Sequence, residues 1–412
     1  MSDYTSDFLR TLDARGYLKQ LTHEGELDAY CAGKSGVPVA YIGFDATADS
    51  LHVGSLVGIM ALRHFQQSGG KPIVLIGGGT TKVGDPTDKE KSRPILTDAE
   101  IAKNAEGIRK AFEPFLTFGD GPTDAVMVNN ADWLEGIGYI DFLREIGPLF
   151  TVNTMVKQDT VARRLRAEQP YTFLEFNYLL LQSYDFLELS RRMECFLQMG
   201  GSDQWGNIIG GVDLIHKADG KQGFGLTWPL ITTASGGKMG KTADGAVWLN
   251  ADKKSPYEYW QFWRNTEDAD VGRFLRLFTE LPLDEIAKLE ALEGADINTA
   301  KVALANAATT LLHGKAAAKE AEATASATFE AGTGEGLPTF TVAPGVGILD
   351  ATVTAGLAAS NGEVRRHIKG GALKVNDERV PDHTLTLSES DLRDGVVKLS
   401  VGKKKHALLT FG

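Results

Sequence analysis

The chain has 412 residues, of which 42% are hydrophobic and 24% are charged, and its formal net charge is −11. This length exceeds that of one ordinary core, so two or three domains are expected. Its two cysteines, Cys31 and Cys195, lie far apart in the sequence. That spacing argues against a disulfide framework or a structural zinc site and favours a cytoplasmic protein. No signal peptide and no apolar segment of about 20 residues is present, so no membrane partner is expected.

The charge is unevenly distributed along the chain. Residues 361–412 contain ten Lys or Arg against seven Asp or Glu, a local charge of +3, which leaves −14 for the residues before them. The negative total argues mildly against a nucleic-acid partner, but the basic tail is electrostatically distinct from the rest.

The first 230 residues alternate short β-rich segments with amphipathic ones. Residues 39–44 and 72–76 are expected to be strands, and residues 56–67 between them a helix. This rhythm predicts a Rossmann-like, doubly wound parallel α/β sheet. Another apolar segment, 125–128, is followed by two asparagines, and polar residues at the carboxyl ends of such strands are where ligands normally bind.

The rest of the chain predicts two further domains. Strand signals disappear between about residues 255 and 329, where Ala-, Leu- and Glu-rich segments favour helices. Residues 332–347 contain five glycines and two prolines without a helical period, which indicates a linker. The predicted order is a Rossmann-like domain at 1–230, an α-helical domain at 231–331, the linker, and a small α+β module at 348–412.

Residues 41–55 predict a strand, a loop and the start of a helix near Ser55. The free N–H groups of a helix N-terminus favour an anion, and Gly54 would let a nucleotide approach the backbone closely. Thr47 and His52 could donate hydrogen bonds to phosphate oxygens. A helix cap or a surface position is the structural alternative for His52.

A second predicted strand ends in residues 77–80 (GGGT) and is followed by Asp85, Lys89 and Arg93. The glycines do not form the GxGxxG fingerprint of nicotinamide cofactor sites. A carboxylate beside a basic loop suits an enzyme that handles an ammonium group and a polyphosphate. A solvated loop is the structural alternative.

The predicted helix at residues 174–187 carries a polar stripe in largely apolar surroundings. Tyr178, Gln182 and Asp185 stand at positions i, i+4 and i+7, so they share one face. Leucine and phenylalanine cover most other directions, which predicts that the helix is largely buried and that the stripe needs polar partners inside the protein. A pocket for a small polar ligand would supply them. An amphipathic helix with a solvated side is the alternative.

Two glycine-containing loops complete the candidate motifs. Residues 198–207 again predict a strand, a loop and a helix start, in which Asp203 could accept both ribose hydroxyls. A helix cap is the alternative there. Residues 235–242 lack the first glycine of a P-loop and open no helix, so that interpretation is rejected. Lys238 and Lys241 on such a loop still suit a clamp on a triphosphate that closes during reaction.

In this order the motifs resemble those of the bacterial tyrosyl-tRNA synthetases, which belong to the first of the two synthetase classes. Residues 52–55 (HVGS) are similar to the HIGH signature of that class, and residues 238–242 (KMGKT) to its KMSKS signature. The polar stripe of helix 174–187 matches the tyrosine group, and residues 200–206 (GGSDQWG) make the combination specific. The resemblance extends over essentially the whole chain.

The resemblance implies a role for each candidate residue. The side chains implied to bind tyrosine are Tyr41 and Asp185 at its hydroxyl, Asp85, Tyr178 and Gln182 at its ammonium group, and Gln198 and Gln204 near its carboxylate. The residues implied to bind ATP are Gly43, Asp45, Gly54, Ser55, Gly201, Asp203, Lys238, Met239 and Lys241. The catalytic residues, implied to hold the departing pyrophosphate, are Thr47, His52, Lys89, Arg93, Lys238 and Lys241.

The implied activity is that of a tyrosine–tRNA ligase, which activates L-tyrosine with ATP to tyrosyl-adenylate and pyrophosphate and then transfers tyrosine to the 3′-terminal adenosine of tRNA(Tyr). The tyrosine carboxylate attacks the α-phosphate, so alignment and cations supply the catalysis and no protein nucleophile is needed. Mg²⁺ is expected to arrive with ATP, and no protein-bound metal is expected. The family also suggests a homodimer in which one tRNA spans both subunits.

Two positions depart from the family pattern. Ile42 stands where a cysteine is often found, which removes a thiol contact to the ribose, and Ser55 stands where the HIGH signature ends in histidine. Nucleotide affinity is therefore expected to differ from that of other members. Asp185 is expected to exclude phenylalanine, which would leave the carboxylate unpaired, so no editing domain is expected.

The basic tail resembles the small αβ RNA-binding module of a ribosomal small-subunit protein. A basic helix, a Gly-Gly turn and a strand follow one another in residues 360–376. A solvated charged face is the alternative. The residues expected to contact RNA are Arg365, Arg366, Lys369, Lys374, Lys403, Lys404 and Lys405.

Two other functions remain open from the sequence. A tryptophanyl-tRNA synthetase has the same architecture, although Asp185 with Tyr41 suits a phenol. An RNA-binding or RNA-splicing factor on a synthetase-like scaffold would lack aminoacylation, and the presence of both phosphate-handling signatures argues against it.

Overall fold

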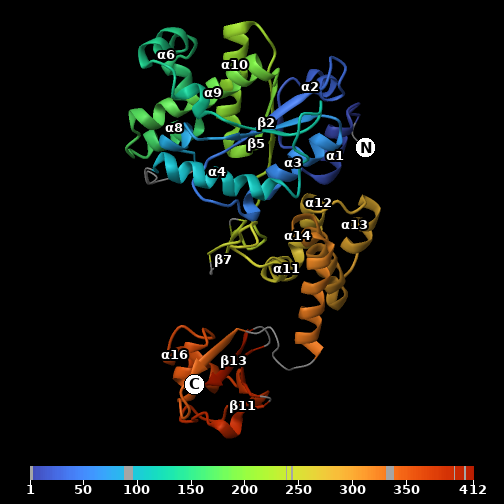
Figure 1. Ribbon diagram of the computed structural model, residues 1–412, viewed down its shortest axis with the longest axis vertical. Helices are drawn as coiled ribbons and strands as arrows, with labels where there is room; N and C mark the ends of the chain where they lie inside the picture. The colour runs from blue at the N-terminus through green and yellow to red at the C-terminus, as the bar shows by residue number, and fades with distance from the viewer. Residues whose placement is uncertain are drawn as a thin grey trace. The chain divides into compact units, whose positions relative to one another are not determined.

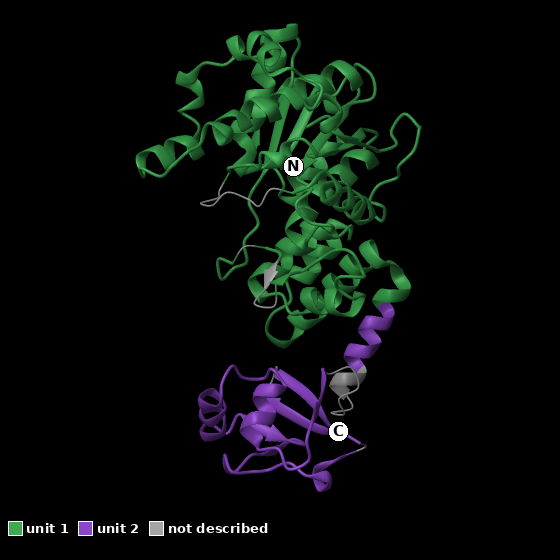
Figure 2. Ribbon diagram, turned by 60° about the vertical axis from the view of Figure 1, so that its left-hand side comes forward, with its two compact units in different colours: residues 1–318 green, residues 319–412 purple. Residues whose placement is uncertain are grey.

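The computed structural model describes residues 3–87, 96–237, 239–242, 245–330, 338–393, 395–402 and 405–412. The chain divides into two compact units, residues 1–318 and residues 319–412 (Figure 2). Among the described helices, none combines the length and the apolar character that crossing a membrane requires.

A six-stranded sheet organises the first unit (Figure 1). Its order is β1-β6-β5-β2-β3-β4, in which β2 to β6 pair in parallel and β1 at the edge is antiparallel to β6. The chain runs outward from β2 through β3 to β4 and then returns to β5 on the other side of β2, which is the predicted doubly wound topology. The strands are β1 (Gln20–Leu21), β2 (Val39–Phe44), β3 (Lys71–Ile76), β4 (Val126–Asn129), β5 (Leu197–Gly201) and β6 (Phe224–Trp228).

Helices cover both faces of this sheet because its central strands are apolar on both sides. Tyr41 and Ile73 pack with Phe186 of α9, while Ile42, which points to the opposite face, lies close to Gly58 of α3. The helices are α1 (Asp7–Arg15), α2 (Glu24–Cys31), α3 (Leu56–Gln67), α4 (Asp98–Phe112), α5 (Ala131–Leu134), α6 (Tyr139–Glu145), α7 (Val152–Met155), α8 (Asp159–Arg166), α9 (Phe173–Met193) and α10 (Trp205–Asp219).

Helix α9 shows how the local sequence sets its two ends. A capping box begins it, in which Thr172 accepts from the backbone N–H of Glu175 and the Glu175 carboxylate accepts from the backbone N–H of Thr172. It ends at Glu194, whose left-handed conformation (φ 50°) interrupts the helix. The prediction that this helix is largely buried is confirmed for its middle, but Phe173 and Leu174 in its first turn are exposed.

The regular secondary structure between residues 256 and 330 is entirely helical, as predicted. Arg15 of α1 holds the C-terminal end of α12, because its guanidinium donates to the carbonyl oxygens of Arg276, Thr279 and Leu281 at 3.1, 2.9 and 3.0 Å. These helices are α11 (Pro256–Arg264), α12 (Val271–Phe278), α13 (Leu283–Glu290) and α14 (Ile297–Glu330), the last interrupted at Gly314.

The second unit contains a five-stranded sheet in the order β11-β10-β12-β13-β9. The predicted linker at 332–347 is wrong at residues 339–342, because these form β9, which pairs in parallel with β13. Its sequence, TFTV, has the β-branched and aromatic residues that strands favour, but glycines and prolines on both sides obscured it. The other domain boundaries stay predictions. The elements are β9 (Thr339–Val342), α15 (Ile348–Thr354), α16 (Asn361–Lys369), β10 (Leu373–Val375), β11 (Glu378–Arg379), β12 (Val397–Val401) and β13 (Lys405–Phe411).

Candidate active site

A pocket of 650 Å³ opens at the carboxyl ends of β2 and β5, where the strand order of the sheet reverses. Its walls are formed by the loops that follow these strands, by one face of α9 and by residues between 228 and 232. Lys89, Arg93 and Lys238 lie outside the described residues, as does the side chain of Lys241, whose backbone belongs to the short strand β7 (Lys241–Thr242). The predicted residues that line the pocket are Tyr41, Gly43, Asp45, Thr47, His52, Gly54, Ser55, Asp85, Tyr178, Gln182, Asp185, Gln198, Gly201, Asp203, Gln204 and Met239.

Asp185 lies in the wall of this pocket, and its carboxylate is held by two donors. Asn130 Nδ2 donates to Oδ2 at 2.9 Å, and Trp133 Nε1 donates to Oδ1 at 2.8 Å. The residue is only 2% exposed. Burial raises the pKa of Asp185 to about 7, although the two hydrogen bonds oppose that rise. A carboxylate has about four acceptor positions, so it can take a further donor from a ligand.

Tyr41 places a second polar group beside this carboxylate. Its ring packs on Phe186, and within the described residues its buried hydroxyl has no hydrogen-bond partner. Burial, together with the nearby Asp185 charge, raises the pKa of the Tyr41 phenol well above its ordinary value, so the phenol stays neutral. Buried hydroxyls are normally satisfied, so a ligand hydroxyl at this end of the pocket would complete both groups.

A chain of hydrogen bonds joins the polar residues on the other side of the pocket. Gln204 Nε2 donates to Asp85 Oδ2 at 3.0 Å, and Gln204 Oε1 accepts from Gln182 Nε2 at 3.4 Å and from Asn207 Nδ2 at 3.1 Å. Asp85 Oδ1 also accepts from the backbone N–H of Thr87 at 2.9 Å. The chain holds the Asp85 carboxylate and the amides of Gln182 and Gln204, which come from three separate segments, in the wall of the same pocket.

The first signature (residues 52–55) and the described part of the second signature (residues 239–242) are in direct contact. A Cβ on Gly54 would lie 2.8 Å from the carbonyl oxygen of Met239, and one on Gly240 would lie 2.7 Å from His52 Nδ1, so neither position has room for a side chain. Gly240 also has a φ of 88°, which favours glycine. Next to this contact, the backbone N–H of Val53 donates to the Val247 carbonyl at 3.0 Å.

His52 caps the short helix that starts the first signature. Its Nδ1 accepts from the backbone N–H of Gly54 at 3.0 Å, and its ring packs edge-on against Trp248. The structural alternative from the sequence is therefore present, and it leaves His52 in the pocket wall. Ile42 and Ser55, the two departures from the family pattern, line the same pocket.

The loop after β5 has a glycine where the backbone passes close to other atoms. A Cβ on Gly201 would lie 2.5 Å from Asp203 Oδ1 and 3.2 Å from Leu230. Glycine at this position therefore keeps room beside the Asp203 carboxylate for a ligand.

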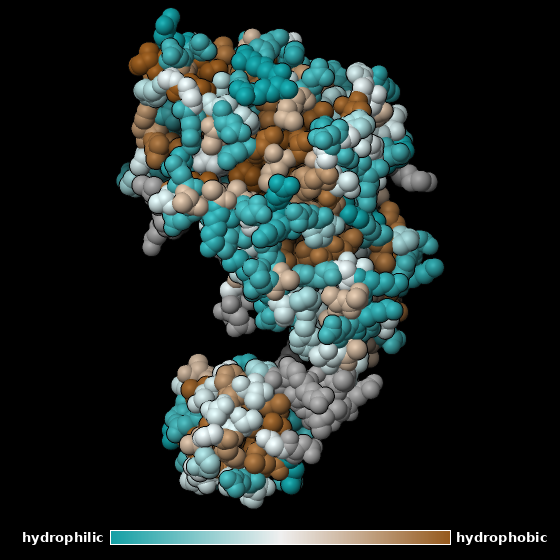
Figure 3. Space-filling view, in the orientation of Figure 1, coloured by the Kyte–Doolittle hydropathy of each residue, from teal (hydrophilic) through white to brown (hydrophobic). Residues whose placement is uncertain are grey.

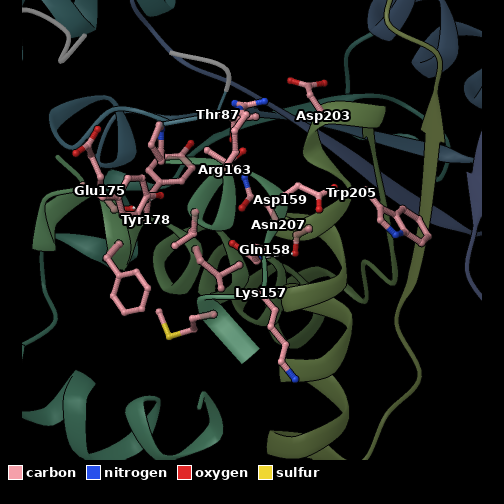
Figure 4. A pocket seen from close by; sticks show the side chains of 18 of the residues that line it. Thr87, Lys157, Gln158, Asp159, Arg163, Glu175, Tyr178, Asp203, Trp205 and Asn207 are labelled. Atoms are coloured by element: carbon pink, nitrogen blue, oxygen red, sulfur yellow. Dashed lines mark hydrogen bonds between the residues drawn. The ribbon is translucent and has the colours of Figure 1, made fainter. Parts of the chain in front are cut away.

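A second cavity, of 420 Å³, lies beside the first and shares Thr87, Tyr178, Asp203 and Leu230 with it. Figure 4 shows its lining, in which the labelled basic, amide and aromatic side chains come from α8, α9, α10 and the turn before α8, and lie among the carboxylates of Asp159, Glu175 and Asp203. The residues that give it this character are Lys157, Gln158, Arg163, Trp205 and Asn207.

Three site residues were missed by the sequence analysis. Asn130 and Trp133 hold the Asp185 carboxylate, and Thr80 Oγ1 accepts from Asn130 Nδ2 at 2.9 Å. The asparagine pair at the end of β4 was a signal for Asn130, because it marks a strand end in a doubly wound sheet. Nothing in the sequence pairs Trp133 with position 185, since α5 and α9 meet only in the folded chain.

The described residues contain no group of three or more His, Cys, Asp or Glu side chains placed to hold a metal ion. The expectation that the protein has no resident metal stays a prediction.

The predicted RNA-binding residues lie on α16, β10 and β13 of the second unit. Arg365, Arg366 and Lys369 are exposed on α16, and Lys374 is half-buried on β10 after the predicted Gly-Gly turn. Lys405 is exposed at the start of β13. Lys403 and Lys404 lie outside the described residues.

Comparisons with known proteins extend these observations. The family model for tRNA synthetases class I (W and Y) matches residues 34–330, and that for the tyrosine–tRNA ligase SYY-like C-terminal domain matches residues 328–409. The chain is 60% identical to the tyrosine–tRNA ligase of Caulobacter sp. (strain K31), over 99% of this chain and 98% of that protein. It is 57% identical to that of Rhodospirillum rubrum over 98% of both chains.

A solved structure gives the same result for the fold. The C-terminally truncated mitochondrial tyrosyl-tRNA synthetase of Aspergillus nidulans has a TM-score of 0.70 and 28% identity, and covers 78% of this chain and 94% of that one. Fold and family model together define a class I aminoacyl-tRNA synthetase of the W and Y group. The W and Y group contains tryptophan and tyrosine enzymes, and the similarity to full-length relatives decides between them. The chain belongs to the tyrosine–tRNA ligase family.

Proposed function

We propose that the 650 Å³ pocket is the site where this tyrosine–tRNA ligase joins L-tyrosine to ATP. The observation that carries the proposal is the buried Asp185 carboxylate, held by two donors, beside the Tyr41 hydroxyl, which has no partner in the described part of the chain. A tyrosine phenol placed there donates to Asp185 and pairs with the Tyr41 hydroxyl. An unsubstituted phenyl ring offers a partner to neither group, and an indole offers one N–H donor but no acceptor for the Tyr41 hydroxyl.

The opposite end of the amino acid is assigned to the hydrogen-bonded chain around Gln204. Asp85, with Gln182 and Tyr178, receives the ammonium group, because an ionised carboxylate is the strongest acceptor for it. Gln198 and Gln204 lie near the substrate carboxylate, where the buried Gln198 Oε1 has no partner among the described residues. This assignment keeps the substrate carboxylate on the nucleotide side of the pocket.

The nucleotide is assigned to the glycine-lined part of the pocket. Gly43, Gly54 and Gly201 let the nucleotide lie against the backbone, and the Asp203 carboxylate accepts hydrogen bonds from the ribose hydroxyls. The further members of the ATP site are Asp45, Ser55 and Met239, with Lys238 and Lys241 at the phosphates.

Chemistry in this site needs no covalent step on the protein. A carboxylate oxygen of tyrosine attacks the α-phosphorus, the bond from that phosphorus to the bridging oxygen breaks, and pyrophosphate leaves. Thr47, His52, Lys89, Arg93, Lys238 and Lys241 are proposed to stabilise the charge that grows on the phosphates. Mg²⁺ enters with ATP and is held mainly by phosphate oxygens.

The second step brings the 3′-terminal adenosine of the tRNA to the adenylate. We place its approach at the 420 Å³ cavity, because this cavity shares four wall residues with the tyrosine pocket and carries Lys157 and Arg163. The basic face of α16 is proposed to hold another part of the same RNA by its phosphates. A cytoplasmic location is proposed with it.

A homodimer is proposed from exposed apolar side chains. Tyr139 and Ile140 on α6 are 58% and 64% exposed, and Figure 3 shows apolar surface gathered at the upper left, where α6 lies. Large exposed apolar patches mark association surfaces. Sedimentation of the Ile140→Asp variant tests this: a monomer supports the proposal, and an unchanged dimer moves the interface elsewhere.

Exchange of labelled pyrophosphate into ATP tests the activity itself. Exchange that is much more efficient with tyrosine than with tryptophan or phenylalanine supports the proposal. Exchange with tryptophan alone, or none with any of the three, contradicts it.

A further inference from the structure

The loop that leads into the second signature is bound by side chains at the start of α12. Three residues of this region contact three loop residues. Asp270 Oδ2 accepts from the backbone N–H of Ala234 at 2.7 Å, and Glu267 Oε1 accepts from the Ser235 hydroxyl at 2.6 Å. Arg273 donates to the carbonyl oxygen of Thr232. We call Glu267, Asp270 and Arg273 the loop clamp.

The clamp is centred on an ion pair in which the carboxylate is buried and the guanidinium is partly exposed. The Asp270 side chain is 4% exposed, and its Oδ1 lies 2.6 Å from Arg273 Nη2, whereas the Arg273 side chain is 42% exposed. The carboxylate thus holds the loop backbone with one oxygen and the arginine with the other, and the arginine reaches back to the same loop. Removal of Arg273 leaves the buried Asp270 carboxylate without its charged partner, which costs more than the bond itself contributes.

Helix α12 also connects the clamp to the sheet. It contacts α3, the helix that begins at the first signature. Beyond its C-terminal end, Glu280 forms two bonds with Arg63 of α3, at 2.6 and 2.8 Å. The loop before the second signature is therefore bound to α12, and α12 packs on α3, the helix that begins at the first signature.

The contact between the signatures leaves little room for movement. The backbone N–H of Met239 donates to the carbonyl of Ile231 at 3.2 Å, so the residue next to the clamped Thr232 is bonded to the signature. A displacement of the clamped residues is therefore passed to Gly240, which lies against His52.

We propose that Asp270 and Arg273 are positioning residues for adenylate formation, which set residues 239–242 against the first signature although they lie outside the pocket. The inference rests on the proposed role of the second signature in holding the ATP phosphates. Displacement of a charge-stabilising group by about 1 Å is enough to slow a reaction on the order of 100-fold. Tyrosine binding depends on the other side of the pocket, so it should not change.

The test is single-turnover formation of tyrosyl-adenylate in the full-length protein, with tyrosine affinity measured in parallel. Asp270→Ala is expected to slow the step by about 10- to 100-fold at saturating ATP and to leave tyrosine affinity within about twofold. Asp270→Asn, which keeps an acceptor for Ala234, should recover part of the rate. Arg273→Ala should slow the step as well, and Arg276→Ala is its matched control, because Arg276 is also 42% exposed on α12 and pairs with Glu290, away from the loop.

The outcomes separate the clamp from the function on which it rests. The proposal is overturned if Asp270→Ala slows the step no more than Arg276→Ala does, or if it weakens tyrosine binding equally. Lys241→Ala in the same assay tests the signature itself. A slow Lys241→Ala with a normal Asp270→Ala rejects the clamp alone; if both variants are normal, the role proposed for the signature fails and the clamp with it.

Discussion

The two ends of the pocket are built on different principles. At the tyrosine end, Asp185 and Tyr41 are 2% and 1% exposed, and donors from α5 and the end of β4 already fix the carboxylate. At the end proposed for the nucleotide, by contrast, Gly43 and Thr47 are exposed. Under the proposed assignment, the groups that select the amino acid are held in place before it binds, whereas the groups proposed for catalysis lie around the phosphates.

The largest effect is expected at the nucleotide end. Lys241→Ala should slow adenylate formation by about 100- to 1000-fold, because it removes a cation that is proposed to stabilise the charge growing on the phosphates. Tyrosine affinity should stay within about twofold of the original, since the tyrosine end is built separately. Rapid single-turnover measurements give both numbers, and Lys288→Ala, an exposed lysine on α13, is the control. Equal losses of rate and tyrosine affinity would erase the distinction between the two ends.

A smaller effect is expected at the tyrosine end from a residue that does not touch the substrate. Trp133→Phe removes the donor to Asp185 Oδ1 and keeps the aromatic ring, so tyrosine should bind about tenfold more weakly. Trp260→Phe, which removes a similar N–H donor to Asn306 far from the pocket, is the control for equilibrium dialysis. Equal tyrosine affinities of the two variants would mean that the hydrogen bond from Trp133 to Asp185 does not contribute to tyrosine binding.

The pH dependence of binding sharpens the comparison further. Burial raises the pKa of Asp185 to about 7, so below this pH the free protein carries a neutral carboxyl group. A bound phenol favours the carboxylate and lowers that pKa, so tyrosine binding should release a proton. Affinity should then weaken by up to about tenfold for each pH unit below neutrality.

Calorimetry in two buffers of different ionisation enthalpy measures the released proton. Asp185→Asn, which does not titrate, should bind tyrosine weakly at every pH. A wild-type affinity that is constant down to about pH 5.5 would show that the carboxylate is already ionised when free.

The smallest effect is expected in the second unit. Arg365→Ala with Arg366→Ala should raise the KM for tRNA by about three- to tenfold, because each removes one phosphate contact, and should leave pyrophosphate exchange unchanged. Lys398→Ala, a lysine of the same module that pairs with Asp377, should have less effect. Aminoacylation kinetics at two salt concentrations separate the variants, and a change in pyrophosphate exchange would contradict the division of roles.

Local patterns were sufficient for most of the fold. The predicted strand 39–44 and helix 56–67 have the bounds of β2 and α3, because apolar runs and helical periodicity are properties of adjacent residues. Strand β9 was missed, since its pairing with β13 lies almost 70 residues away and its flanks are rich in glycine. Non-local pairing leaves only a weak signal in a short segment.

The residues that line the pocket were predictable from the sequence, but the residues that support them were not. The spacing of Tyr178, Gln182 and Asp185 on one helix face placed all three in the pocket wall. Support for Asp185 was not predictable, because Asn130 and Trp133 reach it only after β4 and α9 are packed together. Residues that touch a ligand leave motifs, whereas residues that hold them in place are set by tertiary packing.

The central claim is that the Asp185 carboxylate selects the phenol of tyrosine. The most direct test is the ratio of kcat/KM for tyrosine to that for phenylalanine in pyrophosphate exchange, compared between the original protein and Asp185→Ala. We predict that the ratio falls by at least about tenfold, because the variant no longer leaves a buried charge unpaired with phenylalanine. An unchanged ratio would contradict the account.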